Sequence, residues 1–208
     1  MLPAVIPIFP LPNAVLFPGV FLPLHIFEPR YRAMVADALD GDRLIGMMLL
    51  KPGWESDYEG RPPVYPVGCA GLVSHVDRLP DGRYNIVLHG LEKFRLLKEH
   101  GEGAYRRGEV ITLAETLDKD AKDQLREERN KLEALLLPTA LGSDAAFPPS
   151  LSDEDLVNAL SQYLNLSPIE RQALLERQDP LDRARSLVEL IEMQALTMKM
   201  PYKSKGMH

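Results

Sequence analysis

Residues 6–32 read IPIFPLPNAVLFPGVFLPLHIFEPRYR, an apolar run that contains six prolines. A proline costs about 3 kcal/mol inside a helix, so this run cannot form a transmembrane helix. It is instead predicted to be extended chain, with one strand at 6–12, a turn at 17–19 and a second strand at 20–26. Because proline cannot donate a ladder hydrogen bond, we expect the first strand at the edge of a sheet.

The pair Glu28-Pro29 marks a change from strand to helix. Proline at the first helical position gives up only a hydrogen bond that the helix would not have made. Apolar residues then recur at the spacing of one helix face, and Gly41 ends the pattern. The residues of this face are Tyr31, Met34, Val35, Ala38 and Leu39.

Short apolar segments continue to about residue 115 and predict a mainly β region. Two of them flank the turn sequence Leu79-Pro80-Asp81-Gly82 and indicate a hairpin. The predicted strands are 44–50, 67–76, 84–89, 94–97 and 109–113, enough with the first two for a small closed or nearly closed barrel. Residues 51–66, which include the only Trp, are predicted to be a long loop, and long ordered loops are often functional.

After residue 115 the apolar spacing becomes helical. Ser152, Ser167 and Asp179 are each followed three residues later by an acid, which is typical of a helix N-terminus. Leucines at 125, 132, 135 and 136 line an earlier helix. The fold class is therefore predicted as α+β, with a β domain at 1–115 and a helical bundle at 116–208, in which 142–150 is a flexible connection.

Composition argues against several classes of function. The net charge of −6 disfavours tight binding to nucleic acid, which relies on neutralising phosphates. No Lys or Arg precedes the N-terminal apolar run, so a signal peptide is not expected. A single cysteine, Cys69, suits a reducing compartment, and the predicted location is the cytoplasm, without membrane association.

Motifs for known catalytic chemistry are missing from the sequence. There is no Gly-Lys pair and hence no Walker-type phosphate loop, and there is no H-E-x-x-H, C-x-x-C or G-x-S-x-G. His25, His75 and His89 fall in predicted strands, where an ordinary surface histidine is a simpler interpretation than a metal ligand. We expect no metal, no cofactor and no enzymatic activity. A hydrolase would need a His-Ser or His-Cys pair from distant strands.

The series FPLPN, LFPG and LPLHIFEPRY between residues 9 and 31, followed by LPDG at 79–82, resembles the N-terminal substrate-binding domain of Lon, the ATP-dependent protease La. The likeness spans roughly 5–115, and the helical segment 156–191 is similar to the bundle that follows in Lon. It implies a PUA-like β-barrel and a helical bundle that recognise protein substrates. The ATPase and peptidase modules do not follow before His208, so we expect a natural stand-alone, non-enzymatic module.

The resemblance suggests a protein partner, either unfolded or hydrophobic polypeptide segments or a dedicated protein, and it leaves a homodimer open. We place the contact at Phe27, Glu28, Arg30 and Tyr31, with Trp54 on the loop acting as a lid. Phe27 and Tyr31 would be aromatic anchors, and Arg30 would bind a carboxylate or a backbone oxygen. The alternative is structural: both rings lie in the core, Arg30 pairs internally with Glu28 or another acid, and Pro29 serves only to start the helix.

RNA binding is the second hypothesis, because PUA-like barrels elsewhere hold RNA. It requires the basic side chains of the barrel to form one surface, and interspersed acids weigh against such a surface. The residues concerned are Arg61, Arg78, Arg83, Lys93, Arg95, Arg106 and Arg107.

Overall fold

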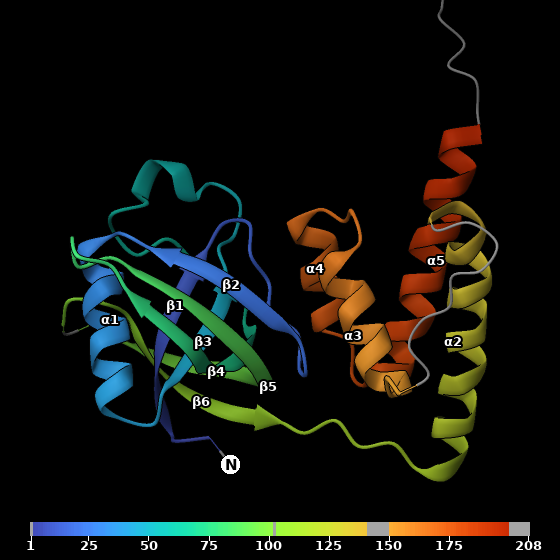
Figure 1. Cartoon of the computed structure of the whole chain (residues 1–208), viewed down its shortest axis with the longest axis horizontal. Helices are drawn as coiled ribbons and strands as arrows, with labels where there is room; N and C mark the ends of the chain where they lie inside the picture. Colours follow the sequence, from blue (N-terminus) through green and yellow to red (C-terminus); the bar gives the residue numbers. More distant parts are fainter. Residues whose placement is uncertain (1, 102, 141–149, 200–208) are drawn as a thin grey trace, which may run out of the picture. The chain divides into compact units, whose positions relative to one another are not determined.

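The computed structural model describes residues 2–101, 103–140 and 150–199 (Figure 1). Within these ranges it contains six strands, five α-helices and a short 3-10 helix, so the predicted α+β class is confirmed. The strands are β1 (Val5–Leu11), β2 (Phe21–Ile26), β3 (Leu44–Leu49), β4 (Val67–Arg78), β5 (Tyr84–His100) and β6 (Arg107–Leu113). The helices are α1 (Pro29–Asp40), η1 (Trp54–Asp57), α2 (Lys119–Ala140), α3 (Asp153–Tyr163), α4 (Pro168–Leu175) and α5 (Pro180–Lys199).

The chain forms two compact units. The first contains residues 1–116 together with 158–177, and the second contains 117–157 together with 178–208. The first unit thus holds all the strands, α1 and α4. The predicted domain boundary after residue 115 stays a prediction, because a later stretch of chain returns to the first unit.

All six strands belong to one sheet with the order β2-β5-β4-β3-β1-β6, and β6 also pairs with β5. The successive pairings of β5, β4, β3, β1 and β6 therefore lead back to β5, and we call these five strands the returning path. β2 lies outside this path as an edge strand. β5 is one strand of 17 residues where the sequence predicted two short ones. Its pairing with β4 shifts between Ala70 and Gly71, whose partners are Glu92 and Gly90, so Leu91 is bulged out. Such a bulge bends a strand without ending it.

The prediction that β1 is an edge strand is wrong, because β1 lies between β3 and β6. It pairs with β6 at Val5–Pro7 and with β3 at Ile8–Leu11. The N–H of Ile8 points to the β6 side, where it donates to the Arg106 carbonyl at 2.8 Å. Backbone N–H groups alternate in direction along a strand, so the nitrogen of Pro7 faces β3 and that of Pro10 faces β6. Pro7 precedes the first pair of the β1–β3 ladder, and Pro10 follows the last pair of the β1–β6 ladder. Neither proline leaves a broken ladder bond.

The core of the first unit is filled from every strand of the returning path. Its central cluster consists of Ile6, Ile8, Met48, Ala70, Phe94 and Val110. The chain also passes close over β5 at Gly90, whose N–H donates to the Val20 carbonyl and whose carbonyl accepts from Gly19 N–H, both at 2.8 Å. Only a residue without a side chain fits there, because an added Cβ would lie 2.0 Å from the Phe17 carbonyl oxygen.

The predictions for α1 and for the later helix starts are confirmed. α1 begins with Pro29 and ends before Gly41, and it buries Tyr31, Met34, Val35 and Ala38. Ser167 and Glu170 form a reciprocal capping box at α4. Ser152 Oγ accepts from Asp155 N–H at 3.0 Å, and Asp179 Oδ1 accepts from Asp182 N–H at 2.9 Å.

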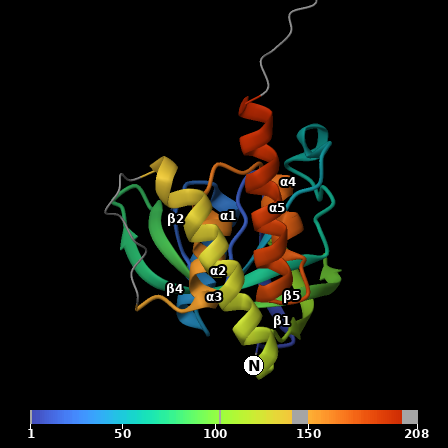
Figure 2. The ribbon, with the colours of Figure 1, turned by 90° about the vertical axis from the view of Figure 1, so that its right-hand side faces the viewer.

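In the second unit, α2 and α5 lie side by side (Figures 1 and 2). Arg129 of α2 donates to Asp153 Oδ1 at 3.0 Å and to the Leu151 carbonyl at 2.6 Å. Arg185 of α5 donates to Gln124 of α2 at 2.6 Å. Nearly all of the predicted connection at 142–150 lies outside the described residues. Within the described part of the chain, no helix has the length and hydropathy needed to cross a membrane.

Candidate functional site

Two charged residues at the start of α1 meet a tyrosine of the loop between β3 and β4. Arg30 Nε donates to Glu28 Oε2 at 2.9 Å, and Arg30 Nη1 donates to the Tyr58 carbonyl at 3.1 Å. The Tyr58 hydroxyl donates to the other carboxylate oxygen, Glu28 Oε1, at 2.7 Å. The three residues thus form a closed set of hydrogen bonds, in which Tyr58 takes part with both its hydroxyl and its backbone carbonyl. The position of Pro29 at the first turn of α1 places Glu28 and Arg30 side by side.

Aromatic rings extend this cluster in both directions. The Arg30 guanidinium carbon lies 4.6 Å from the centre of the Tyr31 ring and 4.8 Å from that of the Tyr58 ring. Tyr31 packs on Phe9 at a centroid distance of 4.4 Å, and Trp54 contacts Tyr58 at 5.4 Å. A guanidinium between two aromatic faces is held by cation–π attraction. We name this series the Arg30 stack; its members are Phe9, Tyr31, Arg30, Tyr58 and Trp54.

The structure brings four of the five predicted site residues together and separates the fifth. Glu28, Arg30 and Trp54 contact Tyr58, a residue that sequence reasoning missed, and Tyr31 lies against Arg30. Nothing in the local pattern of the loop distinguishes Tyr58, because its role depends on Glu28, which lies 30 residues earlier in the chain.

Tyr31 and Phe27 have opposite environments. Tyr31 is 4% exposed and its hydroxyl points to the Pro10 carbonyl, so it belongs to the core and does not offer an anchor at the surface. Phe27 is 60% exposed and its ring lies 6.2 Å from that of His25. The core alternative is therefore correct for Tyr31, and Phe27 lies at the surface.

The environment raises the pKa of both tyrosines in the stack. For Tyr31 the main cause is burial, which disfavours the charged phenolate and outweighs the attraction of Arg30. For Tyr58 the causes are burial and then the hydrogen bond and negative charge of Glu28. Both hydroxyls therefore keep their protons at neutral pH, and Tyr58 acts as a donor toward Glu28.

The folded protein is expected to lose stability as the pH rises above about 10, the usual pKa of tyrosine. There the unfolded chain releases the Tyr31 proton, whereas the folded chain keeps it because its pKa is raised. The folded state then binds more protons, and a higher pH favours unfolding. Tyr31→Phe removes this hydroxyl, so its free energy of unfolding should fall less steeply with rising pH than that of wild type.

Urea unfolding of both proteins from neutral pH to above about pH 10 measures this difference. Near neutral pH the two should be almost equally stable, since the hydrogen bond from Tyr31 to the Pro10 carbonyl is long, at 3.4 Å. Equal slopes in alkaline solution would contradict the assignment of this effect to Tyr31.

Two arginines hold the far end of the loop. Arg61 donates to the His100 carbonyl at 3.3 Å and also to the Gly101 carbonyl. Arg106, which is 7% exposed, donates to the Pro62 carbonyl and to the Glu99 carboxylate at 2.9 and 2.8 Å. The end of the loop also contributes to a small cavity of about 140 Å³, which is lined by Arg30, Tyr31, Glu59, Gly60, Arg61, Gly103, Ala104, Tyr105 and Arg106.

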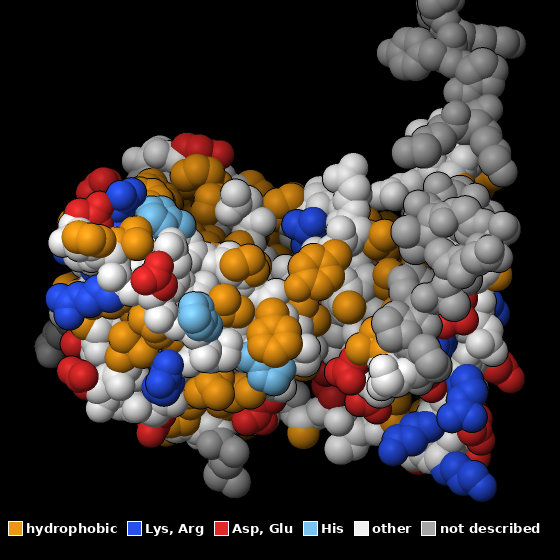
Figure 3. Space-filling view, viewed as in Figure 1, with side chains coloured by type: hydrophobic (Ala, Val, Ile, Leu, Met, Phe, Trp, Pro, Cys, Tyr) orange, Lys and Arg blue, Asp and Glu red, His pale blue; other side chains and the backbone are white. Residues whose placement is uncertain are grey.

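The outer face of β2 and β5 is a second candidate surface. Figure 3 shows hydrophobic and histidine side chains gathered over these strands. Phe21 is 51% exposed, and its ring stacks on that of His89 at 4.5 Å, one strand away. His25 Nδ1 lies 2.7 Å from Asn85 Oδ1. A shallow apolar cavity of about 370 Å³ is lined by Pro23, Leu24, His25, His75, Asn85, Ile86 and Val87.

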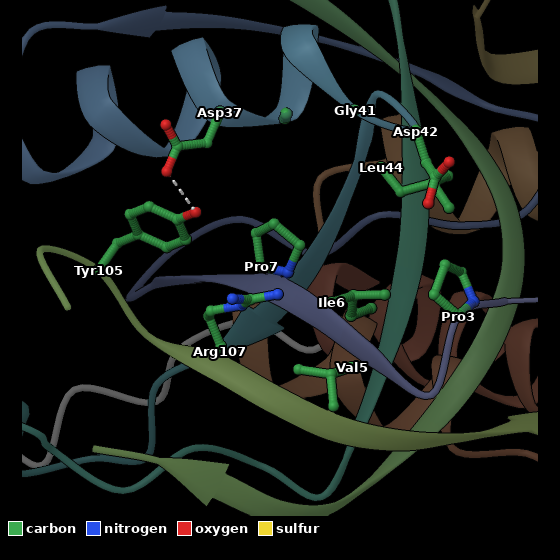
Figure 4. Close-up of a pocket in the computed structure, with 11 residues that line it drawn as sticks. Pro3, Val5, Ile6, Pro7, Asp37, Gly41, Asp42, Leu44, Tyr105 and Arg107 are labelled. Atoms are coloured by element: carbon green, nitrogen blue, oxygen red, sulfur yellow. Dashed lines mark hydrogen bonds between the residues drawn. The ribbon is translucent and has the colours of Figure 1, made fainter. Parts of the chain in front are cut away.

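A third hollow is polar and lies between β1, α1 and the start of β6 (Figure 4). Its volume is about 270 Å³. The Tyr105 hydroxyl donates to Asp37 Oδ2 at 2.8 Å, and burial together with this carboxylate raises the pKa of Tyr105. Asp42 and Arg107 also line it, among apolar residues such as Leu44. Its two carboxylates and one guanidinium show no strong preference for either sign of charge.

Several of the basic residues named for RNA binding are engaged in ion pairs within the protein. Lys93 is 2% exposed and pairs with Glu115 at 2.7 Å. Arg106 pairs with Glu99, and Arg83 pairs with Asp81 at 2.6 Å. Among the described residues there is also no group of three or more His, Cys, Asp or Glu side chains with a geometry suited to a metal ion.

Comparison with known proteins identifies the family of this chain. A family model described as the "ATP-dependent protease La (LON) substrate-binding domain" matches residues 5–193. The Lon protease of Cytophaga hutchinsonii is 26% identical over 197 residues, which cover 91% of this chain and 24% of that protein. Lon protease 2 of Syntrophobacter fumaroxidans is 30% identical over 188 residues, which cover 84% of this chain and 22% of that protein.

Two solved structures share the fold. The N-terminal domain of the Mycobacterium avium complex Lon protease aligns with a TM-score of 0.70 and 19% identity, covering 90% of this chain and 98% of that domain. A Lon N-terminal domain protein from Xanthomonas campestris aligns with a TM-score of 0.60 and 23% identity, covering 95% of this chain and 99% of that protein. The chain spans about a quarter of the length of the curated relatives it matches.

Proposed function

Because this chain belongs to the family of Lon substrate-binding domains, we propose that it is a non-enzymatic module that recognises unfolded or hydrophobic segments of other polypeptides. The family match covers the substrate-binding part and no ATPase or peptidase module. A dedicated protein partner is the other form of the same proposal. The expected place of action is the cytoplasm.

The observation that carries the proposal is the exposure of two phenylalanines on one edge of the sheet. Phe21 and Phe27 are 51% and 60% exposed, at the beginning and just after the end of β2. Large aromatic side chains that remain exposed along one strand are typical of interaction surfaces. Between them lies the apolar cavity lined by Pro23 and Val87, which has room for a side chain of a bound segment.

Proline makes this surface suitable for contact through side chains. Leu22 and Leu24 alternate with Phe21, Pro23 and His25 along β2, which pairs with β5 alone. The Val20 carbonyl accepts from Gly90 N–H, so the backbone groups of Leu22 and Leu24, at every second position after Val20, also point to β5. The backbone nitrogen of Pro23 therefore points to the free edge of β2. A missing N–H at that edge discourages uncontrolled strand addition.

The same proposal includes the finer description of the fold. We infer that the returning path of β5, β4, β3, β1 and β6 is a PUA-like barrel, since each of these strands contributes to one apolar cluster. The helices of the second unit would form the bundle implied by the resemblance. In this description β2 is an appendage of the barrel whose outer face is free for a substrate.

Fluorescence anisotropy tests the function directly. The purified protein is titrated against a labelled, permanently unfolded polypeptide, against its folded parent and against a structured RNA, each at low and moderate salt. We expect preferential binding to the unfolded chain that persists at moderate salt, because apolar contacts are not screened. Binding to RNA alone, with strong dependence on salt, would contradict the proposal. Absence of binding to all three would contradict general recognition of unfolded chains and favour a dedicated partner.

A further inference from the structure

The loop segment 51–61 is attached to the first unit almost entirely by polar and ring contacts. None of its side chains is buried, and only Trp54 and Tyr58 are half-buried. Gly53 has a φ of 90°, a conformation that favours glycine, at the entry to η1. In Figure 1 the short helix η1 stands outside the strands. Segments with few buried apolar contacts are the ones that open locally at low cost.

Tyr58 makes the central attachment, and apart from its ring contact with Trp54 it contacts Glu28 and Arg30, which lie outside the loop. Its ring lies on the Arg30 guanidinium, its hydroxyl donates to Glu28, and its own carbonyl accepts from Arg30. A ring, a phenolic hydroxyl and a backbone carbonyl are present in every tyrosine residue of every polypeptide. The place that Tyr58 fills is therefore one that a tyrosine from another chain can fill with the same contacts.

The groups that receive Tyr58 are held independently of it. Arg30 Nη2 pairs with Glu28 Oε2 at 2.9 Å, and the guanidinium rests on Tyr31, which is fixed in the core against Phe9. Pro29 fixes the backbone between Glu28 and Arg30 at the first turn of α1. The place thus persists when Tyr58 leaves, and it adjoins the 140 Å³ cavity lined by Arg30 and Tyr31.

We propose that Tyr58 is a built-in occupant of an aromatic-binding site formed by Glu28 and Arg30, and that a tyrosine side chain of a bound polypeptide displaces it as segment 51–61 opens. This inference rests on the proposed function and names the side-chain class that the module selects. Only molecules in which the segment is open can bind, so the apparent affinity equals the intrinsic affinity multiplied by the open fraction. The closed segment therefore weakens binding. A tyrosine is preferred over a phenylalanine because Glu28 accepts a hydrogen bond from the hydroxyl.

Three proteins and two small probes test the proposal. Wild type, Tyr58→Ala and Tyr58→Phe are titrated with N-acetyl-tyrosinamide and, as the aliphatic control, N-acetyl-leucinamide, with binding followed by NMR shifts of the Arg30 side chain. Tyr58→Ala empties the site and should bind the tyrosine probe at least about tenfold more tightly than wild type, since a hydrogen bond to a charged group and a cation–π contact become available. Tyr58→Phe keeps a ring in the site but loses the hydrogen bond to Glu28, so its affinity for the probe should lie between those of wild type and Tyr58→Ala.

Hydrogen exchange of the backbone amides gives the second readout. Exchange within 53–61 should be about tenfold faster in Tyr58→Ala and less accelerated in Tyr58→Phe, which loses only the bond to Glu28. Tyr65→Ala, which removes a ring from the same loop near Lys51, is the matched control and should leave probe affinity unchanged. Unchanged exchange in Tyr58→Ala, or equal affinity for both probes, would overturn the proposal.

The outcomes separate this inference from the proposed function. If wild type binds the unfolded polypeptide but Tyr58→Ala gains no affinity for the tyrosine probe, the inference fails and the function stands. If Tyr58→Ala binds the probe while no variant binds the unfolded polypeptide, the aromatic site stands and the function fails. Adding Glu28→Ala to Tyr58→Ala should abolish the preference for a tyrosine probe over its phenylalanine analogue, and a retained preference would count against the role of Glu28.

Discussion

Replacing both Phe21 and Phe27 with serine is expected to weaken binding to an unfolded polypeptide at least about a hundredfold. The two rings are 51% and 60% exposed and flank the apolar cavity on β2. Central aromatic anchors at interfaces typically contribute about 2 kcal/mol or more each, and separated contributions add approximately. Anisotropy titration of the variant against the labelled unfolded chain measures the loss.

The fold should tolerate these substitutions, because each removes a largely exposed side chain and surface changes usually alter stability by about 0.5 kcal/mol or less. A matched control is Leu97→Ser with Ile111→Ser. These residues are 59% and 52% exposed, but Leu97 lies in the part of β5 that pairs with β6, beyond the residues 84–89 that pair with β2, and Ile111 lies on β6 itself. The control should retain wild-type affinity. Equal losses in both variants would indicate nonspecific apolar binding and would remove β2 from the proposal.

Gly90→Ala is expected to destabilise the first unit by about 3–5 kcal/mol, which exceeds the usual effect of a point substitution. The new Cβ would lie 2.0 Å from the Phe17 carbonyl oxygen and 2.9 Å from the carbonyl carbon. Backbone atoms cannot rotate away as side chains do. The segment 17–20 must therefore separate from β5, and the two hydrogen bonds of Gly90 to Gly19 and Val20 are weakened.

Thermal unfolding followed by circular dichroism measures this loss, and a fall in Tm of about 10 °C corresponds to roughly 3–4 kcal/mol for a chain of this size. Gly41→Ala is the matched control, since its Cβ would meet nothing closer than 3.5 Å and its φ is −118°. That variant should change the Tm little. A Tm for Gly90→Ala within about two degrees of wild type would show that the loop over β5 yields easily.

The parts of the fold that follow from local chemistry were predictable. Pro29 and Gly41 bound α1 as expected, and acids three residues after Ser152, Ser167 and Asp179 mark real helix starts. These signals act between residues that are neighbours in sequence. The sequence therefore contains them in a form that can be read without knowing which strands meet.

The parts that depend on distant pairing were not predictable. The prolines of β1 indicated an edge strand, yet the strand changes partner between Pro7 and Ile8 and keeps both neighbours. The long strand β5 was divided in two because Gly90 and the bulge at Leu91 look like a break. Tyr58 was missed because its hydroxyl reaches a carboxylate 30 positions away.

The position of β1 between β3 and β6 has a consequence for the newly made chain. The partner that β1 needs on one side, β6, begins only at Arg107, so a ribosome adding about 5–20 residues per second takes roughly 5–20 s to supply it. During that interval an apolar strand presents an unsatisfied edge to other nascent chains. Pro10 removes a donor from this β6 side in that period and Pro7 removes one from the β3 side, so the residues that fit the finished ladders also protect the unfinished strand.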